Sequence, residues 1–287
     1  MTYMKKLLVF IAAVMLPILG SAQAQINTKK VKIGDFTQKI TKVVLTGNMF
    51  YDNLLENEIV ARWRISPYEF CTLAEFEQLK KSEDYYFLLT TKAQFKKETE
   101  PGLQFLTLVK GGAKAEKGIG AMLEIVSVPF ACAEDPSGME ALFLPAFIDL
   151  IQEHTLKSME NDIHGYSGLS NYTLQLPASK EMRIIFAKND LSSQVDELVI
   201  DDCFDNRMLI AEDEIVEKFL TDTKLNVVVS YVAAPAEPKN GSYCYKMLFD
   251  NHTHTLYYFR KHKISKKLGV GFLAEDIKRI ASTRDIY

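Results

Sequence analysis

Short apolar runs and amphipathic stretches follow one another along the first half of the chain. Residues 43–47 form an apolar run that predicts a buried strand. In the next stretch, apolar side chains recur every three or four residues, as on the buried face of a helix, at Phe50, Leu54, Leu55, Ile59 and Trp63. Thr72 and Glu75 then have the spacing of a capping box at the start of a second helix. An extended segment (64–68), three strands (85–90, 103–109 and 120–129) and a long helix (139–159) complete the predicted set.

The second half repeats this order of elements. The same patterns predict strands at 183–187, 208–210, 227–232, 243–249 and 255–260, and helices at 191–203, 213–220 and 271–282. Apolar positions coincide when the two halves are offset by 141 residues, as for Val43 with Ile184, Ile59 with Ile200, Trp63 with Phe204, Leu79 with Leu220 and Phe87 with Val228. The repetition predicts an internal duplication.

The predicted fold class is α/β, with two tandem similar domains that each consist of a mixed sheet with helices packed on it. We expect the first domain at residues 27–160 and the second at 181–287. Residues 161–180, which are rich in Gly, Ser and Asn, have the composition of a linker.

Residues 1–24 have the three parts of a secretory signal peptide. Lys5 and Lys6 supply the positive charge, an apolar run continues to Leu19, and small residues allow cleavage after Ala22 or Ala24. An uncleaved anchor is the alternative, but a spanning helix needs about 20 apolar residues, more than this run provides. The pattern predicts a periplasmic, secreted or cell-surface protein of a Gram-negative bacterium, with no membrane-spanning segment after signal removal.

Composition narrows the range of partners and leaves the cysteines open. The formal net charge of −3 becomes −5 without Lys5 and Lys6, and such an acidic chain is a poor candidate for nucleic acid binding. The hydrophobic content of 47% indicates packed cores. The cysteines permit the disulfides Cys71–Cys132 and Cys203–Cys244, or are four small buried apolar side chains. We favour the second interpretation.

Residues 52–91 carry a resemblance to a known family. They contain, in order, D-N-L-L-x-N-x-I-V, R-W-R-I-S, T-L-A-E-F-E-Q-L-K-K and D-Y-Y-F-L-L-T-T. This series resembles the α/β domain of the curli-export lipoprotein (CsgG-like) family and the N-terminal domain of TolB. The resemblance implies an α/β fold and a role in the cell envelope. The chain lacks the lipid-anchor cysteine and the recognisable barrel hairpins of the lipoproteins and the β-propeller of TolB, so pore formation is not implied.

The familiar catalytic motifs are missing from the sequence, and no cofactor is indicated. There is no GxSxG, HExxH, GxxxxGK[ST] or GxGxxG pattern. His252 and His254 are the candidate metal ligands, since alternate residues of a strand point to one side. We favour the alternative, that both are ordinary turn residues at a hairpin tip, and expect no metal. Asp201, Asp202 and Asp205 form the densest carboxylate group, at the predicted end of a helix.

Three functions remain open, and the first is preferred. The chain is a non-catalytic envelope protein that acts in binding or assembly with another envelope component, which we expect to be a protein. Alternatively, it is a periplasmic receptor with a small molecule in the inter-domain cleft, or a metal-dependent hydrolase. Aromatic side chains and a local run of positive charge in an acidic chain suggest a partner-contact face at Tyr257, Tyr258, Arg260, Lys261 and Lys263.

The signal pattern generates a first prediction. Mass spectrometry of the protein exported by its native host should find the mature chain starting at Gln23 or Gln25, because small residues precede both positions. Recovery of the intact Met1 terminus from the periplasm would contradict it.

Overall fold

The computed structural model describes residues 33–161, 168–222 and 224–284. The predicted signal peptide lies outside the described residues. Residues 33–161 form a first lobe around a five-stranded sheet of order β2-β1-β3-β4-β5. Its strands are β1 (Ile40–Val44), β2 (Tyr68–Cys71), β3 (Tyr85–Ala93), β4 (Leu103–Lys110) and β5 (Leu123–Cys132). β1, β2 and β3 are parallel, whereas β4 and β5 run antiparallel to their neighbours.

Helices cover both faces of this first sheet. They are α2 (Met49–Arg62), α3 (Leu73–Leu79) and α4 (Met139–Glu160), with short 3-10 helices η1 (Phe36–Gln38), η2 (Ala113–Lys117) and η3 (Ile119–Ala121). The predicted capping box is present: Thr72 Oγ1 accepts the N–H of Glu75, and the Glu75 carboxylate accepts the N–H of Thr72.

Residues 168–284 form a second lobe with the same topology. Its strands are β6 (Arg183–Ala187), β7 (Met208–Ala211), β8 (Val227–Ala233), β9 (Tyr243–Asp250) and β10 (Leu256–Lys263). Its helices are η4 (Gly168–Ser179), η5 (Lys188–Asp190), α6 (Glu197–Cys203), α7 (Asp213–Thr221) and α8 (Ala274–Arg284). The strand order is β10-β9-β8-β6-β7. As in the first sheet, the first three strands in sequence are parallel and the last two run antiparallel to their neighbours. The predicted fold class is confirmed.

The two lobes agree more closely in the order of their elements than in the sequence spacing between equivalent residues. Trp63 and Phe204, which are 141 positions apart, are both extended C-caps that end α2 and α6. Val44 and Ala187, the last residues of β1 and β6, are 143 positions apart. Small insertions and deletions therefore separate the repeats, so a single offset equates only some of the positions.

Two segments differ from their predicted conformation. The helix predicted at 191–203 begins only at Glu197, because Leu191 forms a β-bridge with Phe272 and a turn follows, closed by the bond from the N–H of Val195 to the carbonyl of Ser192. Within the predicted linker, residues 168–179 form η4, which packs on β10. Thr173 Oγ1 bonds both the N–H and the carbonyl of Phe259 at 3.0 Å, which fixes η4 to the edge of the second sheet.

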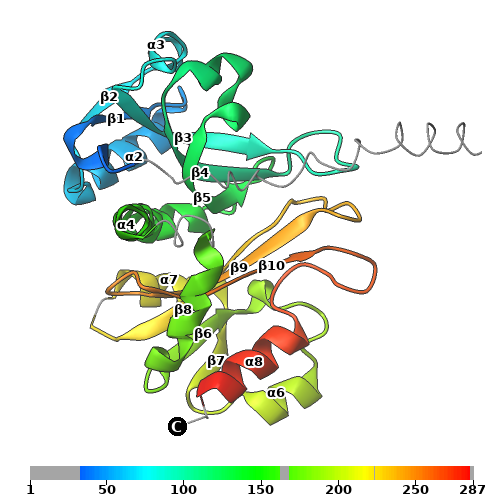
Figure 1. Cartoon of the computed structure of the whole chain (residues 1–287). Coiled ribbons are helices and arrows are strands. Elements are labelled where there is room, and N and C mark those ends of the chain that lie inside the picture. The colour runs from blue at the N-terminus through cyan, green and yellow to red at the C-terminus, as the bar shows by residue number, and fades with distance from the viewer. Residues whose placement is uncertain (1–32, 162–167, 223, 285–287) are drawn as a thin grey trace, which may run out of the picture.

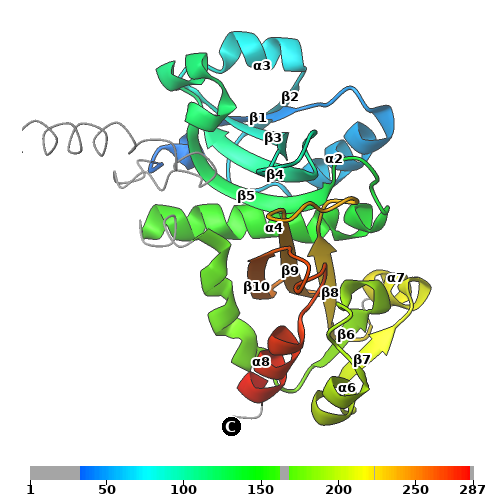
Figure 2. The ribbon, with the colours of Figure 1, turned by 90° about the vertical axis from the view of Figure 1, so that its right-hand side faces the viewer.

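α4 lies between the two sheets and joins the lobes into one body (Figures 1 and 2). The Phe147 ring contacts Phe130 of β5 on one side, and Tyr231 of β8 and Phe249 of β9 on the other. The buried residues of α4 are Phe143, Leu144, Ala146, Phe147, Ile148, Leu150, Ile151, Gln152, His154, Thr155 and Ser158. One continuous hydrophobic core therefore contains side chains of both lobes.

Helical segments cover the outer face of each sheet. α3 and the η2–η3 segment cover the outer face of the first sheet, where Phe76 packs on Phe87. α8 covers the outer face of the second sheet and buries Ile277 and Ile280, while Lys278 and Arg279 are exposed. α8 is thus amphipathic. It differs in this from α4, the last helix of the first lobe, which is apolar on two sides. No helix within the described ranges is both long and apolar enough to cross a membrane.

The shared core generates a second prediction. Phe147→Ala should lower the free energy of unfolding by about 3–5 kcal/mol, because it leaves a cavity between the two sheets. Urea denaturation should show one transition that shifts as a whole, since both lobes lose contacts. As a control, Leu174→Ala should change the stability by less than about 0.5 kcal/mol, because Leu174 is 79% exposed. A separate transition that Phe147→Ala leaves in place would show that the lobes unfold independently.

Candidate functional site

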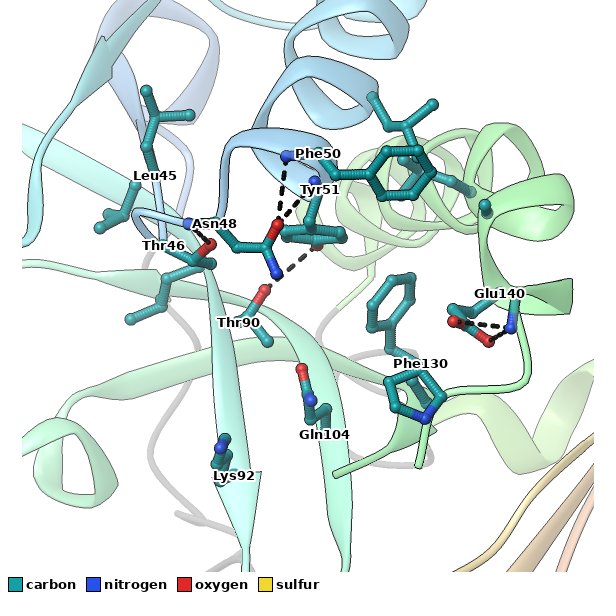
Figure 3. A pocket seen from close by; sticks show the side chains of 18 of the residues that line it. Leu45, Thr46, Asn48, Phe50, Tyr51, Thr90, Lys92, Gln104, Phe130 and Glu140 are labelled. Carbon is teal, nitrogen blue, oxygen red and sulfur yellow. Dashed lines mark hydrogen bonds between the residues drawn. The ribbon is translucent and has the colours of Figure 1, made fainter. Parts of the chain in front are cut away.

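A pocket of about 600 Å³ opens in the first lobe at the carboxyl ends of β1 and β3 (Figure 3). These strands are parallel neighbours, and their connections leave in different directions: β1 continues into α2, and β3 turns back into β4. A crevice forms between such strands because no connecting segment crosses the space between their ends. The topology therefore places the pocket.

The loop after β1 and the first turn of α2 form one wall. The Asp52 carboxylate accepts the backbone N–H groups of Thr46 and Gly47 at 2.8 Å, and Gly47 has a φ of +87°, which favours glycine. Asn48 then caps α2, with its Oδ1 accepting the N–H of Phe50 at 3.1 Å. These bonds hold Phe50 at the pocket, although its side chain is 74% exposed.

The opposite wall is the end of β5 and the start of α4. Gly138, at a φ of +87°, is the N-cap of α4, and the Glu140 carboxylate accepts its N–H at 3.1 Å. Glu140 also accepts a hydrogen bond from the Ser137 hydroxyl at 3.1 Å. This carboxylate is therefore engaged in capping its own helix, where the helix dipole favours a negative charge.

A half-buried tyrosine, Tyr51, joins the two walls across the floor. The Tyr51 hydroxyl lies 3.1 Å from Thr90 Oγ1 on β3, and its ring centroid is 5.3 Å from that of Phe130. Burial raises the pKa of Tyr51 to about 12, although the bond to Thr90 opposes that shift. Tyr51 thus stays protonated at neutral pH and fixes the distance between α2 and β5.

The inside of the pocket is mostly apolar apart from the paired hydroxyls of Tyr51 and Thr90, and polar side chains lie at its rim. Its buried lining residues are Val44, Leu89, Phe130, Ala131 and Leu144. Asn48 and Lys92 are exposed at the rim, and Lys92 is a direct cross-strand neighbour of Gln104 in the β3–β4 ladder. Among the described lining residues, Lys92 and Glu140 are the groups charged at neutral pH. Such a lining can bind and orient an amphipathic molecule.

In the second lobe, the segment before α8 covers the carboxyl end of β6, which corresponds to the end of β1. Ser230 donates a hydrogen bond of 2.6 Å to Asp190, which follows β6, and Phe272 N–H donates to the Asp190 carbonyl at 2.7 Å. A Cβ on Gly271 would lie 2.5 Å from that carbonyl oxygen, so the segment before α8 approaches as only glycine allows. The two lobes therefore differ at the ends of these strands: the first lobe has a pocket there, and the second has a packed segment of chain.

The chain gave no match to protein-family models, curated proteins or solved structures. The resemblance to the curli-export lipoprotein family and to TolB therefore stays a prediction, and function has to be argued from the site itself.

The two histidines of the predicted metal site lie in different surroundings. His252 is exposed in the turn between β9 and β10. His254 Nδ1 lies 2.6 Å from the Asp149 carboxylate of α4, which also pairs with Arg62 at 3.0 Å. His254 therefore forms part of a contact between the lobes that involves residues distant in sequence. Among the residues that the structure describes, no group of three or more His, Cys, Asp or Glu could hold a metal ion.

Asp205 of the predicted carboxylate group and the four cysteines are the other candidates for chemistry. Asp205 accepts the backbone N–H of Arg207 at 2.7 Å and pairs with its guanidinium at 3.0 Å, as expected at a helix end. All four cysteines are free, with Cys71 and Cys244 buried. Burial raises the pKa of the Cys71 thiol to about 11, and of the Cys244 thiol to about 12, so neither is a ready nucleophile.

The predicted partner-contact face is only partly on the surface. Lys261 and Lys263 are exposed, and Tyr257 and Arg260 are half-buried. Tyr258, in contrast, is 0% exposed, and its hydroxyl donates a 2.6 Å bond to the Asp276 carboxylate of α8. Its inclusion in a contact face is wrong, because side chains alternate along β10 and Tyr258 points into the core under α8.

The surroundings of Asp190 generate a third prediction. Burial raises the pKa of Asp190 to about 7 from 3.8, against the lowering effect of the Ser230 bond. Between pH 4 and 7 the folded protein keeps a proton that the unfolded chain releases, so this group makes the free energy of unfolding fall as pH rises. Asp190→Asn should remove that slope in urea denaturation measured from pH 4.5 to 7.5. An identical slope in the variant and the wild type would show that Asp190 ionises normally.

Proposed function

We propose that this protein is a non-catalytic binding protein of the bacterial envelope, and that the pocket between α2 and α4 holds an apolar group of another envelope component. The observation that carries the proposal is the lining: a buried apolar interior, a rim with few polar groups, and a volume of about 600 Å³. Ligand sites of proteins commonly have these features.

The groups around the pocket favour binding over chemistry. Of the described ionisable lining residues, Glu140 caps α4 and Tyr51 is bonded to Thr90. Lys92 is exposed at the rim, and no other lining residue places an acid or a base beside it. A catalytic nucleophile is commonly activated by an adjacent base that is itself held in place, and these lining residues do not form such an arrangement.

The rim offers a way for an apolar group to enter. Phe50 in the first turn of α2 and Leu73 at the start of α3 line the pocket and are both more than half exposed. Exposed apolar side chains gathered around a hollow are typical of binding surfaces. The envelope location rests on the predicted signal peptide and on the resemblance described above.

Filling the pocket tests this proposal. Ala141→Trp should weaken saturable binding of the neutral apolar dye Nile red, because the indole would occupy the space beside Leu144. We expect at least a tenfold loss of affinity in fluorescence titration. Leu174→Trp is the matched control, since it adds the same ring at an exposed site away from the pocket. Equal dye binding by both variants, with unchanged circular dichroism, would rule out this pocket as the site.

A further inference from the structure

We infer that the pocket takes an aliphatic carboxylate, with its hydrocarbon chain inside and its carboxylate at the rim beside Lys92. This inference rests on the proposed function and adds the chemical class of the ligand. It follows from the separation of apolar and polar lining groups along the pocket.

The buried lining indicates that the inserted part of the ligand is hydrocarbon. None of the five buried lining residues has a polar side chain, and the hydroxyls of Tyr51 and Thr90 on the floor are bonded to each other. A ring with heteroatoms would therefore lose hydrogen bonds to water that this lining does not replace. Leu89 and Leu144 supply branched aliphatic walls, and Phe130 supplies a ring that Tyr51 holds in place. A flexible alkyl chain matches such surroundings.

The rim indicates that the polar end is an anion. Lys92 projects from the end of β3, next to the amide of Gln104, and has no ion pair among the described residues. The side-chain amide of Asn48 lies on the facing wall, with its Oδ1 already used in capping α2. An ammonium group and two amide groups provide donors for a carboxylate. A single cation balances one negative charge, which favours a carboxylate over a doubly charged phosphate.

The negative charge of Glu140 does not compete for the same position. Its carboxylate is held by Gly138 N–H and the Ser137 hydroxyl on the α4 side of the pocket, whereas Lys92 and Gln104 lie on the sheet. The two sides of the rim therefore differ in charge, which orients an anionic head toward β3 and β4.

Competition against Nile red tests the inference with dodecanoate, dodecanol and dodecyltrimethylammonium as probes, all below their critical micelle concentrations. Dodecanoate should compete most strongly, and each methylene added from octanoate to dodecanoate should raise affinity about fourfold, the effect of burying one such group. Lys92→Gln should weaken dodecanoate about tenfold, the loss of one charge-assisted hydrogen bond, and leave dodecanol unchanged. Lys96→Gln, an exposed lysine of the same hairpin outside the pocket, is the control.

The outcomes separate this inference from the proposed function. If dodecanol competes as well as dodecanoate and Lys92→Gln changes neither, the pocket binds apolar groups without choosing an anion, and the inference is overturned. Stronger binding of the cationic amphiphile would overturn it as well. If Nile red does not bind the wild type at all, the proposed function fails first.

Discussion

The packing of α4 between two sheets is the interaction on which the rest of the structure depends. A helix that is apolar on two sides cannot be stable at the surface, so each sheet needs the other lobe to cover it. Phe147 shows this directly, since its ring is in contact with aromatic side chains of both lobes. The hydroxyl of Tyr231 adds a hydrogen bond to the carbonyl of Phe130, which links β8 to β5 at the same place. The duplicated units thus form one body.

This arrangement also gives the pocket a rigid wall. The first turn of α4 lines the pocket, while the middle of the same helix is fixed between the sheets. The second lobe therefore contributes to the site without touching it, by holding the helix that forms one side. At the corresponding end of its own sheet, the segment around Gly271 and Phe272 packs against Asp190. Of the two similar lobes, the first therefore forms the pocket and the second supports it.

Much of the fold could be predicted from the sequence because it depends on local patterns. The capping box at Thr72, the strand at 183–187 and the repeated order of elements all follow from periodicity and helix capping. The burial of Tyr258 was missed because aromatic residues in succession do not reveal which face of β10 is covered. The shortened helix α6 was missed because Leu191 pairs with Phe272, 81 positions later.

The pocket itself could not be predicted in this way. Its lining comes from β1, α2, α3, β3, β4, β5, α4 and the loops between them, and ordinary apolar residues such as Leu89 and Leu144 carry no motif. The available signals were the Asn48 cap and the polar residues Lys92 and Gln104, and they acquire meaning only when β3 and β4 are paired. The pairing of His254 with Asp149 likewise depends on the contact between lobes.

Methyl NMR spectroscopy tests the central claim, a single ligand site between α2 and α4, most directly. Titration with dodecanoate should shift the methyl resonances of Val44, Leu54, Leu89 and Leu144, which line the pocket. Those of Val228 and Leu248, buried under α8 in the second lobe, should stay in place. Shifts confined to the second lobe or to the contact between lobes, or no saturable shifts at all, would contradict the account.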